Sequence, residues 1–244
     1  MGTVRVVEKA VKKTWDLEGE PKSARVRDMF AEIAPTYDLL NSTMSFRLHH
    51  RWRAAAVRGM RLRPGDIVAD VCCGTGDFGK ALRAAVGKSG AIVGIDYCAP
   101  MLEIAAKKPY ELRLTLGDAG RMPLESGSVD GVTIGWGLRN VPDLRLALSE
   151  VFRILRRGGS FATVDMARPK GAIARTAAGL MFHKGIPLLG SLFGKRDAYT
   201  YLPKSTQRFA SRDELSALMR SAGFGNIRCE DHFFGNICIH WGEK

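Results

Sequence analysis

A glycine-rich turn is the strongest chemical signal in the chain. The sequence from Val68 to Gly79 reads Val-Ala-Asp-Val-Cys-Cys-Gly-Thr-Gly-Asp-Phe-Gly, a buried-strand ending followed by closely spaced glycines. Gly74, Gly76 and Gly79 satisfy G-x-G-x-x-G, the spacing of a nucleotide-binding turn between a parallel strand and a helix. Because this spacing alone is a weak signal, the residues around it must identify the ligand.

The carboxylates that flank this turn, Asp70 and Asp77, predict a cationic ligand. Asp77 falls in the first helical turn, which a pyrophosphate would need for itself. Two unit charges about 4 Å apart in a partly screened site interact by about 4 kcal/mol, which repels a phosphate and attracts a cation. S-adenosylmethionine carries a sulfonium and an ammonium and no phosphate. We therefore expect Asp70, Gly74 and Gly76 to contact S-adenosylmethionine. Asp96, after the next apolar run, would accept hydrogen bonds from a ribose diol in this cofactor or in a dinucleotide.

Polar residues also follow two later apolar runs. Asp118 and Ala119 follow the first of these, where they could bind an adenine ring; a plain surface turn is the alternative. Gly135-Trp136-Gly137-Leu138-Arg139-Asn140 follows the second run. Open α/β sheets bind ligands at the carboxyl ends of their strands. We therefore expect the Gly135 backbone, Arg139 and Asn140 to face a cleft.

A third polar group, Tyr37, Asp38 and Asn41, falls within one helical turn near the N-terminus. Pro35 and Thr36 before it favour a helix start, so the group could be only that.

The elements that must position these residues alternate between apolar runs and amphipathic stretches, as in β-α-β units of a parallel sheet. We expect strands at 67–71, 91–95, 112–116, 129–136 and 160–165, and helices at 78–86, 101–107 and 144–155, the last ended by Gly158-Gly159. Further helices are expected at 25–33, 48–60 and 212–222, and a closing hairpin of strands at 226–230 and 236–241.

Composition limits the class of protein. The 244 residues, 45% of them hydrophobic, suffice for one sizeable α/β domain. The net charge of +12 favours an anionic partner, nucleic acid or a bilayer, unless it only solvates the surface. Five cysteines without metal-type spacing or a secretory signal predict reduced thiols in a cytoplasm and no metal. His49 and His50 lack a cysteine or carboxylate at metal-ligand spacing.

The organisation expected along the chain is simple. A mobile basic tail covers residues 1–24, and a single domain covers 25–244, with a helical cap at 25–62 and an apolar lid insertion at 171–210. No run is long and apolar enough to span a bilayer, because charged residues and Pro187 interrupt the nearest one, 172–193.

Three motifs combine in this chain: Tyr37-Asp38-x-x-Asn41, followed by Ser45, His49 and Trp52; Asp70-x-x-x-Gly-Thr-Gly-Asp77; and Gly137-Leu138-Arg139-Asn140-Val141. Together they closely resemble the C-methyltransferases of menaquinone and ubiquinone biosynthesis, over roughly residues 25–244. Many S-adenosylmethionine enzymes share the Gly-Thr-Gly turn, whereas the combination of the first and third motifs is much more specific.

This resemblance implies a Rossmann-like class I methyltransferase fold, with a seven-stranded, mostly parallel sheet and an antiparallel last strand. It implies transfer of a methyl group from S-adenosylmethionine to a ring carbon of a polyprenyl quinol. The substrate is demethylmenaquinol in one branch and 2-methoxy-6-polyprenyl-benzoquinol in the other, and the sequence looks more like the first. Peripheral contact with a membrane surface and no nucleic acid are expected. A homo-oligomer is left open.

Cofactor contacts of the family carry over to Thr75, Asp96, Asp118 and Ala119. Gly135 stands where the family often has a serine, so only its backbone could serve. Arg47 and Cys72 replace glycines that are usual in the family and in many methyltransferases, respectively.

For the methyl transfer we expect Arg139 to stabilise a developing phenolate, with a water accepting the proton, while Tyr37 and Asn140 orient the ring. Asp38 and His49 are reserve candidates for the base. A nicotinamide-dependent oxidoreductase is the alternative from the glycine spacing alone. Another small-molecule or lipid methyltransferase is the alternative on the same fold.

Overall fold

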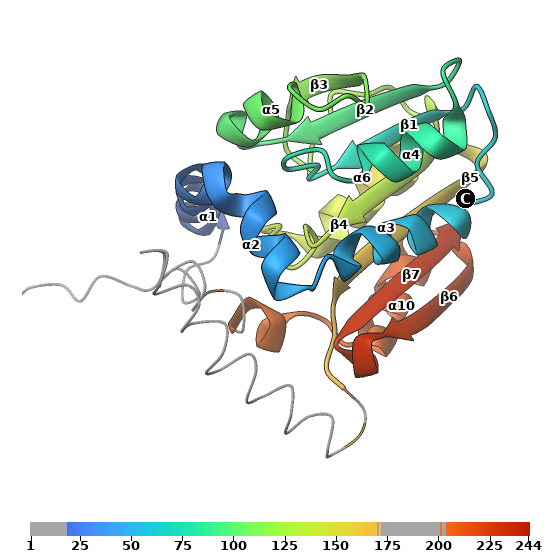
Figure 1. Cartoon of the computed structure of the whole chain (residues 1–244). Helices are drawn as coiled ribbons and strands as arrows, with labels where there is room; N and C mark the ends of the chain where they lie inside the picture. Colours follow the sequence, from blue (N-terminus) through green and yellow to red (C-terminus); the bar gives the residue numbers. More distant parts are fainter. Residues whose placement is uncertain (1–18, 170, 172–200, 202–203) are drawn as a thin grey trace, which may run out of the picture.

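A seven-stranded sheet forms the centre of the protein (Figure 1), in the order β3-β2-β1-β4-β5-β7-β6. The computed structural model describes residues 19–169, 171, 201 and 204–244. The strands are β1 (Ile67–Val71), β2 (Ala91–Asp96), β3 (Leu112–Leu116), β4 (Val129–Gly135), β5 (Leu155–Met166), β6 (Gly225–His232) and β7 (Ile237–Glu243). β1 to β5 pair in parallel, and β7 runs antiparallel to both β5 and β6. The expected sheet with a reversed last strand is confirmed.

Helices cover both faces of the sheet (Figure 1). α3 (Leu48–Arg58) and α4 (Gly79–Val86) pack on one face, and α6 (Leu144–Ile154) and α10 (Arg212–Ser221) pack on the other. α1 (Gly19–Ile33), the 3-10 helix η2 (Ala34–Thr36) and α2 (Tyr37–Met44) form a cap beside the carboxyl ends of the strands. α5 (Ala99–Ala105) follows β2, and the 3-10 helix η4 (Phe233–Gly235) joins β6 to β7.

The central strands are apolar on both faces because two cores enclose them. Val68 of β1 packs in the same core as Leu82 of α4, whereas its neighbour Ala69 packs in the core of Leu148 of α6. Strands buried on both faces read as continuous apolar runs rather than as alternating patterns. This is why such runs located the central strands β1, β2, β4 and β5 in the sequence.

The last strand anchors the helix that precedes β1. The indole N–H of Trp241 in β7 donates a hydrogen bond of 2.8 Å to the carbonyl of Ala56 in α3. Gly59 ends α3 against the same indole, and a Cβ at Gly59 would lie 2.3 Å from it. The C-terminal hairpin and the N-terminal part of the domain therefore share one packed joint.

Helix α6 ends at Ile154 and not at Gly158-Gly159. The Gly158 N–H donates to the carbonyl of Lys244 at 2.7 Å, and the Lys244 N–H donates to the carbonyl of Gly159 at 3.0 Å. Both glycines belong to the start of β5, so the expectation that they end the helix is wrong.

The outer segments differ from expectation or lie outside the described residues. α1 begins at Gly19, ahead of the expected helix start at Arg25, so residues 19–24 are helical where a tail was expected. Residues 1–18 and most of the expected lid at 171–210 lie outside the described part of the chain; residues 204–208 of that lid are helical.

Candidate active site

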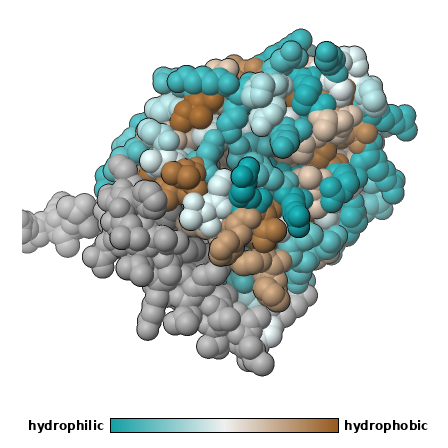
Figure 2. All heavy atoms as spheres, in the orientation of Figure 1, coloured by the Kyte–Doolittle hydropathy of each residue, from teal (hydrophilic) through white to brown (hydrophobic). Residues whose placement is uncertain are grey.

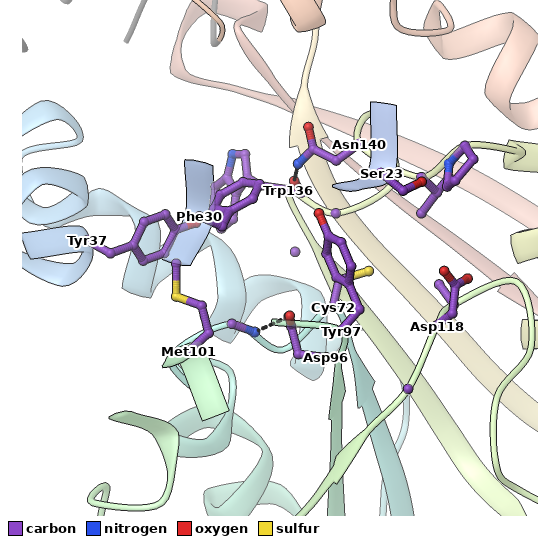
Figure 3. A pocket seen from close by; sticks show the side chains of 17 residues that line it. Ser23, Phe30, Tyr37, Cys72, Asp96, Tyr97, Met101, Asp118, Trp136 and Asn140 are labelled. Carbon is purple, nitrogen blue, oxygen red and sulfur yellow. Dashed lines mark hydrogen bonds between the residues drawn. The ribbon is translucent and has the colours of Figure 1, made fainter. Parts of the chain in front are cut away.

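A pocket opens at the carboxyl ends of β1, β2, β3 and β4 (Figure 3). The turn after each strand contributes to its wall, and the helical cap covers it with Phe30 of α1 and Tyr37 of α2. Seven of the predicted site residues line it: Tyr37, Gly74, Asp96, Asp118, Ala119, Gly135 and Asn140. The predicted residues Asp70, Thr75, Gly76 and Arg139 are not part of its wall.

The glycine turn after β1 adopts left-handed backbone conformations. Gly74 has φ +55°, and nothing lies within 4 Å of the Cβ that it lacks, so its backbone is open to the pocket. Gly76 has φ +78°, and a Cβ there would lie 2.6 Å from Leu112. Cys72, at a usual glycine position, also has a positive φ of +53°. Gly74 therefore suits close ligand approach, whereas Gly76 packs against β3.

Asp96 at the end of β2 is positioned by the turn. Its Oδ2 accepts the Gly74 N–H at 2.8 Å (Figure 3), and its Oδ1 accepts the Cys98 N–H at 2.9 Å. Burial raises the pKa of Asp96, and these backbone hydrogen bonds oppose the rise. An ionised carboxylate has about four acceptor positions. The two backbone N–H groups occupy two of these acceptor positions and fix the Asp96 side chain. The remaining positions can accept hydrogen bonds from the hydroxyls of a ribose.

The wall beyond Asp96 fits a flat ring. Tyr97 and Met101 line it together with Ala119, and Asp118 adds a carboxylate whose Oδ1 accepts the Gly120 N–H at 2.6 Å. An adenine could lie among these side chains and donate its amino group to Asp118. Sequence reasoning missed Tyr97 and Met101, since an aromatic or a methionine after a strand is equally typical of a core residue.

Asp77 does not face this pocket, so the expectation that its charge selects a cationic ligand is wrong. Its Oδ1 lies 2.5 Å from Nζ of Lys108, and its Oδ2 lies 3.6 Å from Arg53 and from His49. Burial alone would raise the pKa of Asp77, but Arg53 and Lys108 together lower it. The charge of Asp77 is therefore neutralised by the protein itself.

The preference for a cation has a different source. Asp96 and Asp118 line the pocket, and none of the described wall residues is Lys or Arg. Asp70 lies behind the turn, buried in β1, where its Oδ1 accepts the hydroxyl of Thr133 at 2.8 Å while its Oδ2 has no partner among the described residues. Burial raises the pKa of Asp70 to about 7. These carboxylates fit a sulfonium ligand and oppose a diphosphate.

Thr75 connects the turn to the cap rather than to the pocket. Its hydroxyl donates to Oδ1 of Asp38 at 2.5 Å, and Oδ2 of Asp38 lies 2.8 Å from Nζ of Lys108. His49 is also engaged, because its Nδ1 accepts from Arg53 at 2.5 Å. Burial and Arg53 lower the pKa of His49 to about 3. Asp38 and His49, the reserve bases, are thus both held in protein contacts.

The segment after β4 presents backbone and amide groups to the pocket. A Cβ on Gly135 would lie 2.7 Å from the ring of Phe78, so only glycine fits there. The Asn140 amide donates to the Trp136 carbonyl at 3.1 Å, and its Oδ1 accepts the hydroxyl of Tyr201 at 3.1 Å. Asn140 is therefore fixed in one orientation at the pocket edge.

Arg139 is buried beside the pocket and pairs with Asp165 at the end of β5. Nη1 of Arg139 lies 2.5 Å from Oδ1 of Asp165. Nε of Arg139 and Oδ2 of Asp165 are buried and have no partner among the described residues. Burial raises the pKa of Asp165, and Arg139 opposes the rise. Sequence reasoning missed Asp165, because no local motif marks a buried carboxylate near the end of a strand.

Comparison with known proteins decides the family. Residues 19–244 match the ubiE/COQ5 methyltransferase family. The chain belongs to this family. It is 38% identical over 236 residues to the demethylmenaquinone methyltransferase of Desulfitobacterium hafniense, covering 94% of this chain and 93% of the relative. It is 37% identical over 231 residues to the demethylmenaquinone methyltransferase of Staphylococcus aureus, covering 93% and 96% of the two chains.

A solved structure supports the fold of this methyltransferase. The SAM-dependent methyltransferase from Thermotoga maritima superposes with a TM-score of 0.65 at 22% identity, over 89% of this chain and 98% of that one. The protein is thus an S-adenosylmethionine-dependent methyltransferase, and the carboxylates of its pocket fit that cofactor. In the described part of the methyltransferase, no helix has the length and apolarity needed to cross a membrane.

Proposed function

We propose that this methyltransferase transfers a methyl group from S-adenosylmethionine to a ring carbon of demethylmenaquinol, giving menaquinol. The family membership and the names of the two relatives support this substrate. The structural observation that carries the proposal is the pair of unpartnered buried atoms beside the pocket, Nε of Arg139 and Oδ2 of Asp165. Neither residue lines the pocket, but a ring hydroxyl that reached past the wall at Asn140 would meet one donor and one acceptor there.

The reaction requires electron density on the ring carbon. S-adenosylmethionine supplies a methyl group on a positively charged sulfur when it is bound. A phenolic hydroxyl with a pKa near 10 must lose its proton, which needs a shift of about 2 to 3 units at roughly 1.4 kcal/mol per unit. One desolvated cation at close range supplies a shift of this size. Arg139 is such a cation, because its side chain is 7% exposed.

Each polar residue then has one task. Oδ2 of Asp165 accepts the hydroxyl proton, and Arg139 stabilises the phenolate oxygen that remains. Bound S-adenosylmethionine would supply the methyl group and leave as the neutral thioether. The methylated ring carbon then loses its hydrogen and Asp165 returns its proton to the ring oxygen, so each turnover releases one proton. Asn140 and Tyr37 orient the ring from the pocket wall. Burial raises the pKa of Tyr37, so its hydroxyl stays protonated and serves as a donor.

We further propose that the enzyme works in the cytoplasm and contacts the membrane surface peripherally, because a polyprenyl substrate resides in the bilayer. Phe46 and Phe234 are 73% and 83% exposed. Arg47, which follows Phe46 in the chain, and Arg51 are also exposed. Figure 2 shows hydrophobic atoms in separate clusters within a hydrophilic surface. Apolar tips beside cations favour an anionic bilayer. The lid expected at 171–210 would cover the prenyl tail.

The substrate proposal is tested by a direct competition. The purified enzyme is incubated with methyl-labelled S-adenosylmethionine and equal amounts of a short-chain demethylmenaquinol and the corresponding methoxy-benzoquinol, and the products are separated by mass spectrometry. We expect label in the naphthoquinol. Label only in the benzoquinol, or in neither, would overturn the assignment. Quinones from cells that lack the protein should contain the unmethylated naphthoquinone precursor.

A further inference from the structure

We propose that Cys229, Cys238 and His240 form a zinc site on the C-terminal hairpin, separate from the methyl-transfer pocket. One ligand atom from each residue lies within 4.8 Å of the other two. Ligand atoms around a tetrahedral zinc are about 3.6 to 3.8 Å apart when they are sulfur and nitrogen. Small side-chain rotations therefore suffice to close the three residues on one ion.

Strand pairing, and not sequence spacing, brings these residues together. Cys229 of β6 lies opposite His240 of β7, and Cys238 lies opposite Asp231, two positions from Cys229. Alternate residues of a strand share a face, so the three ligands point to the same side of the hairpin. The expectation of no metal rested on C-x-x-C spacing, which a site assembled across two strands does not need.

The two thiols suit a soft divalent ion. The Sγ atoms of Cys229 and Cys238 lie within 4.8 Å of each other. Cys238 is buried, whereas Cys229 is exposed, so an ion can reach the pair from solvent. Thiolate and imidazole ligands select zinc over magnesium or calcium. With three protein ligands, a water completes the tetrahedron on the exposed side.

The imidazole of His240 makes a hydrogen bond to a backbone carbonyl, as the imidazoles of metal-binding histidines do. Its Nε2 lies 3.1 Å from the carbonyl oxygen of Arg212. Because a carbonyl only accepts, Nε2 carries the hydrogen, and Nδ1 of the neutral ring keeps its lone pair. Zinc-ligating histidines donate their second N–H to a carbonyl or carboxylate in this way, which fixes the ring orientation.

The charges around the hairpin site are already balanced. Arg212 forms an ion pair with Asp231 and donates to the carbonyls of Arg168 and Gly235.

A second group of suitable residues, His49, His50 and Asp77, differs in this respect. Asp77 there pairs with Lys108, and His49 accepts from Arg53, so a cation would meet two fixed positive charges. We assign no metal to that group.

The site would stabilise the sheet edge. Among the strands that the structure describes, β6 is at the edge of the sheet and pairs only with β7. A metal that joins Cys229 of β6 to two residues of β7 clamps this edge in the manner of a cross-link, because it binds the folded hairpin and not the unfolded chain. The inference is independent of the proposed substrate, since none of the three ligands lines the pocket.

The test uses the full chain, reduced and freed of metal, titrated with zinc against a chromophoric chelator and separately with cobalt. We expect one ion per chain, thiolate-to-cobalt absorption with tetrahedral visible bands, and a higher unfolding temperature with zinc. Cys238→Ser should weaken zinc binding at least tenfold and abolish the temperature shift. Cys98→Ser, at another buried free cysteine, is the matched control and should bind normally.

Three results would overturn the site. The first is the absence of stoichiometric zinc binding to the folded, reduced protein. The second is equal binding by the Cys238→Ser and Cys98→Ser variants. The third is a Cys229–Cys238 disulfide that persists under thiol reductant, seen as the loss of two hydrogens in the intact mass. Should Cys238→Ser fail to fold, Cys229→Ser, at an exposed position, provides the same comparison.

Discussion

The hydroxyl of Thr75 donates a hydrogen bond of 2.5 Å to the carboxylate of Asp38. Thr75 belongs to the glycine turn and Asp38 to helix α2, so this bond joins the glycine turn to the helical cap. Lys108 strengthens the joint, because its ammonium contacts both Asp38 and Asp77. Since Tyr37 of the same helix lines the pocket, the joint holds the cap over the pocket.

Removing this joint should weaken cofactor binding. In Asp38→Ala the cap loses its contacts with Thr75 and Lys108, and we expect the Kd for S-adenosylmethionine to rise about tenfold, or about 1.4 kcal/mol. Isothermal titration calorimetry measures the change. Asp28→Ala, which removes an exposed carboxylate of α1, is the control and should leave the Kd unaltered. An unchanged Kd in Asp38→Ala would show that the cap does not depend on this joint.

The buried pair of Arg139 and Asp165 should control the chemical step. Asp165→Asn keeps the side-chain shape but removes the proton acceptor, and we expect kcat to fall about 100-fold or more with little change in cofactor Kd. Arg139→Lys should lower kcat similarly, because a lysine cannot reproduce the planar guanidinium. Single-turnover kinetics with labelled cofactor separate chemistry from binding. Arg153→Lys, in the Glu150 pair of α6, is the control. Near-native turnover in Asp165→Asn would exclude Asp165 as the acceptor.

Asp70 should make stability depend on pH. Its pKa rises from 3.8 to about 7 on folding because of burial, so the folded protein holds this proton more tightly than the unfolded chain. The bound proton therefore stabilises the folded protein fully at low pH, and this stabilisation is lost as the pH rises from 3.8 to about 7. Over this range the free energy of unfolding falls by about 1.4 kcal/mol per pH unit.

Denaturant unfolding of the wild type and of Asp70→Asn over this pH range isolates the contribution. The difference in unfolding free energy between the two proteins should change steadily up to about pH 7 and then stay constant. Parallel profiles for the two proteins would show that Asp70 titrates normally.

Gly135 should not tolerate a side chain. Its missing Cβ would lie 2.7 Å from the ring of Phe78, closer than packed atoms allow. We expect Gly135→Ala to destabilise the protein by about 1 to 3 kcal/mol, measured by chemical denaturation, and Phe78→Leu to recover part of the loss. Gly225→Ala is the control, since its Cβ would meet only the Glu243 carbonyl at 4.0 Å. Equal stability of the two variants would contradict the proposed clash.

The sheet was predictable because its signals are local. Apolar runs located β1 to β5, whereas β6 and β7 were expected as a closing hairpin; β1 and β3 have the predicted bounds of 67–71 and 112–116. The turn residues Gly74, Asp96 and Asp118 also follow from their positions after strands, since the carboxyl ends of parallel strands meet at one edge.

Side-chain partners were not predictable, because the fold brings them from distant parts of the chain. Asp77 meets Lys108, which lies beyond the next strand and helix, and Arg139 meets Asp165 across a helix and a strand. A sequence shows that a carboxylate follows a glycine turn but not which cation neutralises it. The preference of the pocket for a cation therefore comes from the carboxylates on its wall and not from Asp77.

The joint between Trp241 and helix α3 has a consequence for biosynthesis. The carbonyl of Ala56 leaves the ribosome long before the indole that binds it. A nascent chain must hold α3 without its anchor until β7 has emerged, so this joint closes only after the strand that carries Trp241 has left the ribosome. Until then, the apolar face of α3 lacks the partners in β7 that complete its core.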